Sequence, residues 1–361
     1  MTQTRSGPRP LASILDIVPY KGGEKPATGH KLSSNENPLG AAPIVQDALR
    51  EAAAHLELYP DGGASALRQA IAEAHGLDPD RIVCGAGSDE IFQLLGRAYL
   101  APGDNIIQSE HGFLVYGLVA QQSGAEIRSA PENDYTADVD AMLERVSERT
   151  RIVFLANPNN PTGTYLPHDA IKRLHAGLPD NVLLVLDGAY AEYVRRNDYS
   201  SGLELAAEMP NVLMTRTFSK IHGLAALRLG WAFGPASVID AIHRVRGPFN
   251  VSSLAQAAGI AALKDRSFVD SSLAHNDAEL ERVTTGLTSL GLTVIPSVCN
   301  FVLIDVGSAD RASAADAYLR ARNIYLRAMG AYKLPHCLRL SIGTAQANTD
   351  VLEALAAFQK T

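Results

Sequence analysis

Between about residue 40 and residue 250, short apolar runs alternate with segments whose apolar residues have helical spacing. This alternation is typical of βαβ units, in which helices cover a mostly parallel sheet. The runs are short and bounded by Gly, Pro, Asn or Asp, which favours strands over buried helices. The predicted strands are Ile82–Cys84, Asn105–Gln108, Arg151–Ala156, Val182–Asp187, Val212–Thr217 and Leu229–Phe233, and the predicted helices include Ser88–Leu100 and Ala170–Ala176.

The pattern changes after residue 250, where longer helical stretches precede two strand-like runs. We therefore expect an α/β protein with a large domain at residues 36–250 and a smaller α+β domain that contains residues 251–361. Residues 1–35 either join the smaller domain or cross the cleft. Because no low-complexity linker separates the domains, they should pack closely and form a site between them. The segments assigned to the smaller domain are Ser253–Leu263, Phe268–Leu290, Asn300–Asp305 and Cys337–Ile342.

The composition is that of an ordinary globular protein and argues against several classes of partner. The chain has 361 residues, 46% of them hydrophobic, which is enough for a large buried core. A formal net charge of -7 argues against binding of polyanions such as nucleic acid, so small molecules are the expected partners. No apolar run has the length of a signal peptide or a membrane span, so we expect neither secretion nor membrane insertion.

The cysteines and histidines show no metal-binding or disulfide pattern. Cys84, Cys299 and Cys337 lie far apart and form no CxxC pair, so neither a disulfide framework nor a thiolate zinc site is predicted. None of the ten histidines has the spacing of a metal site. We therefore expect no metal, and a reducing, cytoplasmic setting.

Lys220 is the first candidate for chemistry. It follows the apolar strand Val212–Thr217, in the segment Thr215-Arg216-Thr217-Phe218-Ser219-Lys220, and Arg228 comes eight residues later. A lysine that is desolvated at a strand end and flanked by cations has a lowered pKa, which makes it a usable amine nucleophile toward an aldehyde. A lone lysine is more often a solvated loop residue, so this interpretation depends on its neighbours.

Asp187 ends the very apolar strand Val182–Asp187. The carboxyl ends of the strands in an open α/β sheet face the crevice where ligands bind. There a carboxylate could pair with a protonated pyridine nitrogen; the alternative is that Asp187 caps the next helix. Tyr190, three residues on, could donate a hydrogen bond to a ring oxygen, or it could be a packed tyrosine with a solvated hydroxyl.

Two further segments follow predicted strands at this edge of the sheet. The run from Asn157 to Gly163 contains two prolines and a glycine, so it should be a rigid turn that could hold Asn160 against a ring oxygen. Phe113, in His111-Gly112-Phe113, could stack on an aromatic ring, although core packing is an equally good interpretation.

The segment Gly85-Ala86-Gly87-Ser88-Asp89-Glu90 predicts an anion site where a strand turns into a helix. Glycines let the backbone approach the anion, and the free N–H groups of a helix N-terminus favour negative charge. A dinucleotide fingerprint is excluded because the third glycine of that motif is missing. Ser88 on its own could equally be a helix cap.

The order and spacing of these motifs resemble those of the fold-type I, class II aminotransferases, over nearly the whole chain. Within this group the chain most resembles the histidinol-phosphate aminotransferases, because of its first and last motifs. The motifs that carry the resemblance are Ser33-Ser34-Asn35-Glu36-Asn37-Pro38-Leu39-Gly40, Tyr59-Pro60-Asp61, Ala86-Gly87-Ser88-Asp89-Glu90, Asn159-Asn160-Pro161-Thr162-Gly163, Asp187-x-x-Tyr190, Ser219-Lys220, Arg228-Leu229-Gly230 and Arg339-Leu340-Ser341-Ile342-Gly343-Thr344.

The resemblance implies pyridoxal 5′-phosphate as the cofactor and Lys220 as its Schiff-base lysine. It places Asp187 on the pyridine nitrogen and Asn160 and Tyr190 on the ring oxygen, with Phe113 stacked on the ring. Tyr59 is implied to reach the cofactor phosphate of a neighbouring subunit, which predicts a homodimer. The residues implied around the phosphate of the same subunit are Ala86, Gly87, Ser88, Thr217, Ser219 and Arg228.

The resemblance also implies a substrate pair, histidinol phosphate and 2-oxoglutarate, that reacts with ping-pong kinetics in histidine biosynthesis. Arg339 would bind the anionic group of each substrate in turn, with Arg327 and Tyr20 at the phosphate and Asn35 and Asn160 nearby. A guanidinium group suits carboxylates and phosphates, but Arg327 could equally be a surface cation.

Three other functions remain open at this stage. The same fold and cofactor could transaminate aromatic amino acids or decarboxylate a phosphorylated amino acid, because the fold does not decide which bond breaks. A non-catalytic, aminotransferase-like sensor is disfavoured, because the lysine, the aspartate and the phosphate-binding segment are all retained.

Overall fold

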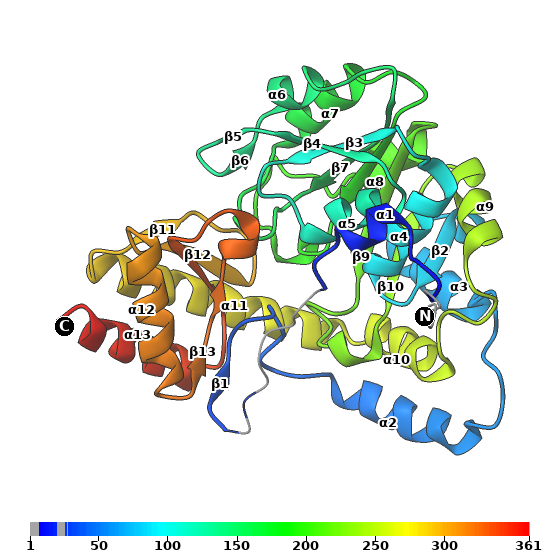
Figure 1. Ribbon diagram of the computed structural model, residues 1–361. Helices are drawn as coiled ribbons and strands as arrows, with labels where there is room; N and C mark the ends of the chain where they lie inside the picture. Colours follow the sequence, from blue (N-terminus) through cyan, green and yellow to red (C-terminus); the bar gives the residue numbers. More distant parts are fainter. Residues whose placement is uncertain (1–6, 20–25, 27, 361) are drawn as a thin grey trace, which may run out of the picture.

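The computed structural model describes residues 7–19, 26 and 28–360 (Figure 1). Its main sheet has seven strands in the order β2-β10-β9-β8-β7-β3-β4. Every strand runs in the same direction except β10, which is antiparallel to both β2 and β9. The strands are β2 (Ile82–Gly85), β3 (Asn105–Ser109), β4 (Glu126–Ala130), β7 (Thr150–Ala156), β8 (Leu183–Asp187), β9 (Val212–Thr217) and β10 (Gly230–Phe233).

Helices cover both faces of this sheet, which is why the central strands are apolar throughout. In β8, Leu183 and Val185 pack into the core on one face, while Leu184 and Leu186 pack into the core on the other. A strand buried on both faces has no polar alternation, so its polar residue, Asp187, comes only at its end. One face is covered by α4 (Ser88–Tyr99), α5 (Leu114–Gln122) and α9 (Ala236–Val245), and the other by α3 (Ser65–His75), α6 (Val139–Leu143), α7 (His168–Ala176), α8 (Leu203–Glu208) and α10 (Ser253–Lys264).

The second domain is built on a four-stranded antiparallel sheet in the order β11-β12-β15-β14. Its core contains Leu32 together with residues of the C-terminal third of the chain, and a short parallel pair joins β1 to β13. Residues 28–35 therefore pack with this domain. Its elements are β1 (His30–Lys31), α11 (Arg266–Ser289), β11 (Thr293–Ile295), β12 (Phe301–Asp305), α12 (Ala309–Arg320), β13 (Ile324–Tyr325), β14 (Arg327–Ala328), β15 (Cys337–Ser341) and α13 (Ala345–Phe358).

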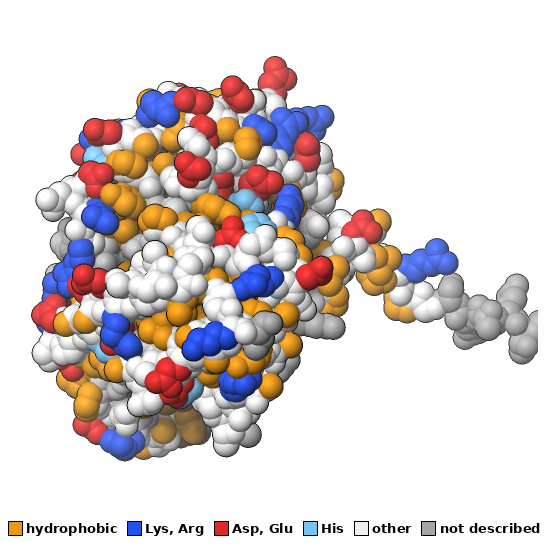
Figure 2. Space-filling model, turned by 90° about the vertical axis from the view of Figure 1, so that its left-hand side faces the viewer, with side chains coloured by type: hydrophobic (Ala, Val, Ile, Leu, Met, Phe, Trp, Pro, Cys, Tyr) orange, Lys and Arg blue, Asp and Glu red, His pale blue; other side chains and the backbone are white. Residues whose placement is uncertain are grey.

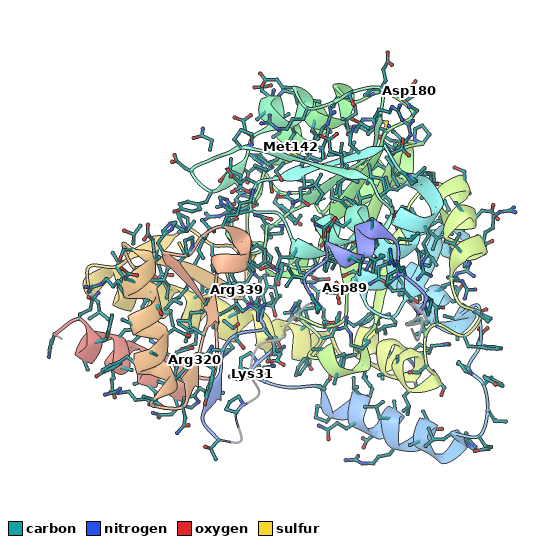
Figure 3. The ribbon with its side chains drawn as sticks, in the orientation of Figure 1. Lys31, Asp89, Met142, Asp180, Arg320 and Arg339 are labelled. Atoms are coloured by element: carbon teal, nitrogen blue, oxygen red, sulfur yellow. The ribbon has the colours of Figure 1, made fainter. Side chains whose placement is uncertain are left out.

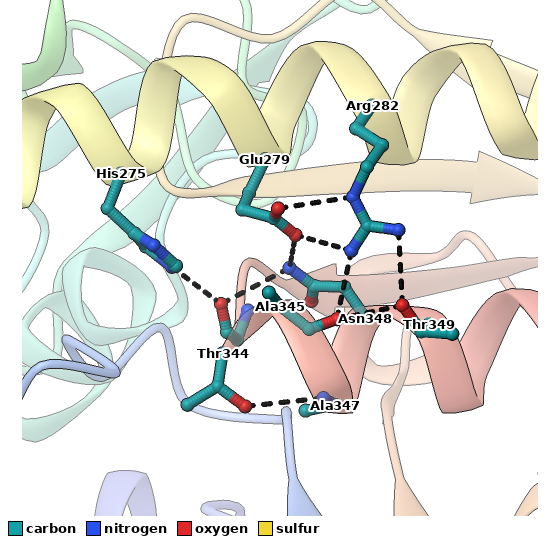
Figure 4. A network of polar contacts seen from close by, with 9 residues as sticks. His275, Glu279, Arg282, Thr344, Ala345, Ala347, Asn348 and Thr349 are labelled. Atoms are coloured by element: carbon teal, nitrogen blue, oxygen red, sulfur yellow. Dashed lines mark hydrogen bonds and ion pairs between the residues drawn. The ribbon is translucent and has the colours of Figure 1, made fainter.

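A polar network fixes α11 against the start of α13 (Figure 4). Glu279 accepts hydrogen bonds from Arg282 at 2.6 Å and from Asn348 at 2.7 Å. Arg282 also donates to the carbonyl oxygen of Ala345, the first residue of α13, at 2.9 Å. Because both charged groups are hydrogen-bonded, the network stabilises the orientation of the two helices.

The six strands predicted for the large domain are present, whereas β4 was not predicted. The boundary predicted at residue 250 stays a prediction, but α10 packs on α2 (Pro43–Ala52) and α3 and contributes Ala255 and Ala258 to the core of the large domain. The remaining elements are α1 (Ala12–Leu15), the hairpin β5 (Glu132–Asn133) and β6 (Thr136–Ala137), and five single 3-10 turns at Ala53–His55, Pro79–Arg81, Ala191–Tyr193, Ala225–Leu227 and Gly330–Tyr332.

Candidate active site

A cavity of about 250 Å³ lies where the carboxyl ends of β7, β8 and β9 face the smaller domain. This is the edge at which open α/β sheets bind ligands. We call it the active-site cavity. Its lining residues are Lys31, Ser34, Glu36, Ser88, Asp89, Phe113, Ala156, Pro158, Asn160, Asp187, Ala189, Tyr190, Thr217, Ser219, Lys220, Ala225 and Arg228.

Lys220 projects into this cavity just beyond the end of β9. Its ammonium group donates a hydrogen bond to the carbonyl oxygen of Ser34 at 3.0 Å and lies 5.7 Å from the centre of the Tyr190 ring. Burial, together with the nearby charge of Arg339, lowers the pKa of Lys220 from 10.5 to about 8. Roughly a tenth of the amine is therefore neutral, and nucleophilic, at pH 7, far more than for an ordinary lysine.

Asp187 ends β8 as a buried carboxylate with three donors. One oxygen accepts from the Tyr116 hydroxyl at 2.7 Å, and the other accepts from the Ala189 amide at 3.1 Å and from the Thr215 hydroxyl at 3.4 Å. Burial raises its pKa from 3.8 to about 6 although these hydrogen bonds oppose the shift. Such a group is well suited to pair with a cation that enters the cavity.

Tyr116 was missed by the sequence analysis. It lies on α5, is fully buried, and stacks on Phe154 with 4.6 Å between ring centres. Burial and the neighbouring Asp187 raise its pKa well above the ordinary value, so it is a hydrogen-bond donor at physiological pH. Its role is to orient the carboxylate. In the apolar run Leu114-Val115-Tyr116 nothing distinguishes it from an ordinary core residue.

Asn160 and Tyr190 both line the cavity. The side-chain oxygen of Asn160 accepts a hydrogen bond from Arg339, and Asn160 is buried. The Tyr190 hydroxyl accepts from the Asn35 amide at 2.8 Å, so the tyrosine keeps its own proton for donation. The Tyr190 hydroxyl and the Asn160 amide group are therefore available as donors, and their predicted contacts with a ring oxygen stay predictions.

Asn35 is held by a network that the sequence did not reveal. Its backbone amide donates to Ser341 at 2.8 Å, and the Ser341 hydroxyl donates back to the Asn35 side chain at 2.9 Å. Asn300 donates to the Asn35 carbonyl oxygen at 3.0 Å. These bonds fix Asn35 in a left-handed conformation with φ of 56°, which orients its amide toward Tyr190.

The predicted anion site lies at the first turn of α4. Ser88 begins this helix, and the hydroxyl-bearing Thr217 and Ser219 line the cavity beside it. A side chain at Gly87 would place its Cβ 2.6 Å from the guanidinium of Arg228, and one at Gly230 would place its Cβ 2.4 Å from the Ser88 amide. Only glycine therefore allows Arg228 and β10 to approach this turn so closely.

Arg228 and Ala86 are two further residues that were predicted at this anion site. The Arg228 guanidinium donates to Asp89 at 3.3 Å and to the Ala225 carbonyl oxygen at 3.2 Å, and it is half-exposed. The Ala86 amide donates a hydrogen bond to the Glu90 carboxylate at 2.6 Å. Neither Ala86 nor Gly87 lines the active-site cavity. The phosphate-binding roles expected for Ala86 and Gly87 stay predictions.

A second cavity adjoins the first and shares Ser34, Asp89, Phe113, Asn160, Tyr190 and Lys220 with it. It extends toward Arg327 and Arg339 on the smaller domain. Figure 3 shows Asp89 on the side of the large domain and Arg339 on the side of the smaller domain. Phe113 separates the cavity from the core, where it contacts Tyr116 edge to face. This adjoining cavity extends the space beside Lys220 toward two cations.

Tyr59 is a predicted site residue that the described part of the chain does not bring to the cavity. Tyr59 is 82% exposed and stacks on Phe249, with 4.7 Å between ring centres, and it does not line either cavity. Its expected partner is another subunit, so the prediction stands untested. Tyr20 lies outside the described residues.

Comparison with known proteins identifies the family. The family model for aminotransferase class I and II matches residues 28–355. The chain belongs to this family, as the resemblance of its motifs predicted. The predicted fold class, that of the fold-type I aminotransferases, is likewise confirmed.

The chain is similar to histidinol-phosphate aminotransferases. It is 54% identical to that of Rhodopseudomonas palustris (strain HaA2) over 98% of this chain and 99% of the relative, and 55% identical to that of Maricaulis maris over 97% and 99%. The crystal structure of the histidinol-phosphate aminotransferase from Sinorhizobium meliloti in complex with pyridoxal-5′-phosphate superposes with a TM-score of 0.92, at 29% identity and 99% coverage of both chains.

Proposed function

We propose that this protein is a pyridoxal-phosphate-dependent aminotransferase that moves an amino group between histidinol phosphate and 2-oxoglutarate in histidine biosynthesis. The observation that supports it best is that Lys220 and the buried carboxylate of Asp187 line one cavity at the sheet edge. Relatives 54% identical over nearly the whole chain are histidinol-phosphate aminotransferases.

The chemistry of the cavity fits the cofactor. Pyridoxal phosphate supplies an electron-withdrawing ring that stabilises a carbanion next to the transferred nitrogen. Asp187 would pair with the ring nitrogen, and Asn160 and Tyr190 would donate to the ring oxygen. The phosphate would be held by Arg228 and by hydroxyl groups at the first turn of α4, where the helix N-terminus favours an anion.

Lys220 would both hold the cofactor and move the proton. A pKa of about 8 lets the amine accept a proton and return it near neutral pH, as a general base and then a general acid must. The carbonyl oxygen of Ser34, at 3.0 Å, orients the amine.

The substrate proposal depends on two arginines. Arg327 on β14 and Arg339 on β15 are directly opposite in an antiparallel pair, and both line the adjoining cavity. Like charges at such positions repel each other, so an anion that binds between them would relieve the repulsion. Arg339 would bind the carboxylate or the phosphate of either substrate, and Arg327 would assist at the phosphate of histidinol phosphate.

Replacing Arg327 by alanine should weaken use of histidinol phosphate more than use of an unphosphorylated aromatic amino acid. Loss of one charged hydrogen bond corresponds to about 2–3 kcal/mol, or roughly 30- to 150-fold in kcat/KM for histidinol phosphate. Steady-state kinetics of both substrates measures the difference, with Arg322→Ala as a control in an exposed position of the same domain. Equal losses for both substrates would give Arg327 a structural role.

The function itself is tested with the purified protein, pyridoxal phosphate, histidinol phosphate and 2-oxoglutarate. Glutamate should form, and glutamate alone should convert the cofactor from its aldehyde to its amine form, which absorbs differently. Faster turnover of aromatic amino acids than of histidinol phosphate would overturn the substrate assignment. Release of carbon dioxide from a phosphorylated amino acid would favour a decarboxylase instead.

We further propose a homodimer in the cytoplasm. Leu56, Leu58, Tyr59 and Phe249 form an exposed apolar group with exposed fractions of 66%, 62%, 82% and 47%. The N-terminal segment with α1 projects from the body of the molecule and exposes further apolar side chains (Figure 2). Apolar surface of this kind is typical of subunit contacts. Among the described residues no helix is long and apolar enough to cross a membrane.

Complementation between inactive variants should show whether Tyr59 serves the neighbouring subunit. Tyr59→Ala and Lys220→Ala proteins, each of low activity, should regain partial activity after subunit exchange, because one of the two sites in a heterodimer then carries both native residues. Exchange is followed with tagged subunits, and the activity of the mixture is measured. A proven heterodimer without activity would remove the shared-site proposal.

A further inference from the structure

A second group of reactive side chains lies in the smaller domain, outside both cavities. Asp305 ends β12 and Cys337 begins β15, and the two residues are directly paired in the antiparallel sheet. His336 precedes Cys337, and its Nε2 lies 3.9 Å from the Asp305 carboxylate. One carboxylate oxygen, one imidazole nitrogen and the thiol sulfur all lie within 4.8 Å of one another.

A tyrosine of the large domain reaches the same group. Tyr135 lies in the turn of the β5–β6 hairpin, and its hydroxyl is 3.5 Å from the Nε2 of His336. The hydroxyl also interacts with the Cys337 thiol. The hairpin is itself tied to the segment that follows Asn160, because the Thr164 hydroxyl donates to the Tyr135 carbonyl oxygen at 2.7 Å. The group therefore bridges the two domains.

We propose that Asp305, His336 and Cys337 bind a zinc ion, with Tyr135 or a water molecule as the fourth ligand. A thiolate, an imidazole and a carboxylate are the ligand types that zinc takes in a tetrahedral site. Zinc bond lengths place neighbouring ligand atoms about 3.3–3.6 Å apart, so the present separations require shifts of about 1 Å. His336 and Asp305 are partly exposed, which gives the ion a route to the buried sulfur.

The carboxylate is already oriented for this role. The Gly307 amide donates to one oxygen of Asp305 at 2.7 Å, and the other oxygen faces His336. Without a metal the thiol stays protonated, since burial and the charge of Asp305 raise the pKa of Cys337 to about 12. A bound cation reverses this preference and removes the thiol proton. Zinc binding should therefore release a proton.

The sequence could not indicate this site. Asp305 is separated from His336 by a helix, two short strands and a 3-10 turn, and only the register of β12 on β15 brings them together. The expectation of no metal was based on the absence of a CxxC pair and of histidine spacing, whereas this group takes a single cysteine and a single histidine.

Cobalt(II) is the probe for the experiment, because a tetrahedral thiolate site gives it visible ligand-field bands and a sulfur-to-metal charge-transfer band. The untagged, cofactor-loaded protein is titrated with Co²⁺ and then with Zn²⁺, and the spectrum and the heat of binding are recorded. One ion should bind per chain, Zn²⁺ should displace Co²⁺, and the melting temperature should rise with zinc concentration.

Variants separate the proposed site from adventitious binding. Cys337→Ser should abolish the sulfur-to-metal band, and His336→Ala and Asp305→Asn should each weaken zinc binding strongly. Tyr135→Phe should weaken it by roughly tenfold, as loss of a weak or outer ligand does. Cys84→Ala, at a buried cysteine outside the group, and His55→Ala, at an exposed histidine, should bind as the wild type does.

Two results would overturn the proposal: no thiolate band in the wild-type protein, or the same band in Cys337→Ser. His336→Ala alters a partly exposed side chain and should fold normally. Its zinc affinity therefore tests the proposal if Cys337→Ser is unstable. Unchanged zinc affinity in Tyr135→Phe would mean that Tyr135 of the β5–β6 hairpin does not contribute to the site.

Discussion

Replacing Lys220 by alanine should lower transamination by at least roughly 10⁴-fold, because the variant loses both the amine that holds the cofactor and the group that moves the proton. Lys220→Arg should be equally inactive, since a guanidinium group stays protonated. Turnover with histidinol phosphate and 2-oxoglutarate measures the loss. Lys31, the other lysine of the cavity, pairs with Glu36 at 2.6 Å, so Lys31→Ala should lose far less.

A second measurement distinguishes the loss of chemistry from the loss of cofactor. Treatment of the holoenzyme with borohydride should fix the cofactor to the peptide that contains Lys220, and mass spectrometry should find the label there. The Lys220→Ala protein should still retain some cofactor through the phosphate site but acquire no label. Label on Lys31, or wild-type turnover of Lys220→Ala, would reject the assignment.

Much of the fold could be predicted because the central strands are buried on both faces. In β8 every residue from Leu183 to Leu186 is apolar, so the strand and its polar end were evident. The edge strand β4 was not predicted, since Glu126 and Arg128 are polar residues on a strand with one free edge. A sequence pattern reports burial: β2, at the other edge of the sheet, is buried throughout and was predicted, whereas β4 is only partly buried.

The candidate site, like the fold, could be predicted only in part from the sequence. Residues at or just after strand ends, such as Asp187 and Lys220, were singled out because chain direction brings strand ends to one edge. Tyr116 was missed because its contact with Asp187 joins a helix face to a strand end, and no local spacing encodes that contact. Ser341, which holds Asn35 across 306 residues of chain, was recognised only as part of a motif and without this role.

The contacts of Arg339 could not be predicted from its strand for the same reason. The strand pattern indicated that Arg339 could face the cleft, and it lines the adjoining cavity. Its hydrogen bond to Asn160 crosses from one domain to the other, and its bond to the Ser33 carbonyl oxygen joins it to the N-terminal segment that packs with the smaller domain. Contacts between domains depend on how the domains pack, which a pattern within one segment does not report.

Replacing Asp187 by asparagine should slow proton abstraction by roughly 10²–10³-fold while leaving the fold intact, because it removes a fixed charge that acts at the reacting ring. The ring nitrogen would lose the anion that keeps its proton in place. Asparagine has nearly the same shape and can still accept from the Tyr116 hydroxyl. Single-turnover rates with histidinol phosphate measure the effect directly, with Asp187→Glu as a variant that keeps the charge but displaces it.

Although Asp187→Asn should lower activity, it should not lower the stability of the cofactor-free protein at pH 8. The pKa of Asp187 is raised from 3.8 to about 6 by folding, so the folded state binds the proton more tightly than the unfolded state does. The free energy of unfolding therefore falls as pH rises from about 4 to about 6, and above pH 6 the buried charge costs roughly 3 kcal/mol. Asp187→Asn removes this cost and should unfold no earlier than the wild type at pH 8, as thermal melts would show. A less stable variant with unchanged single-turnover rates would mean that Asp187 is a structural residue and that another group holds the ring nitrogen.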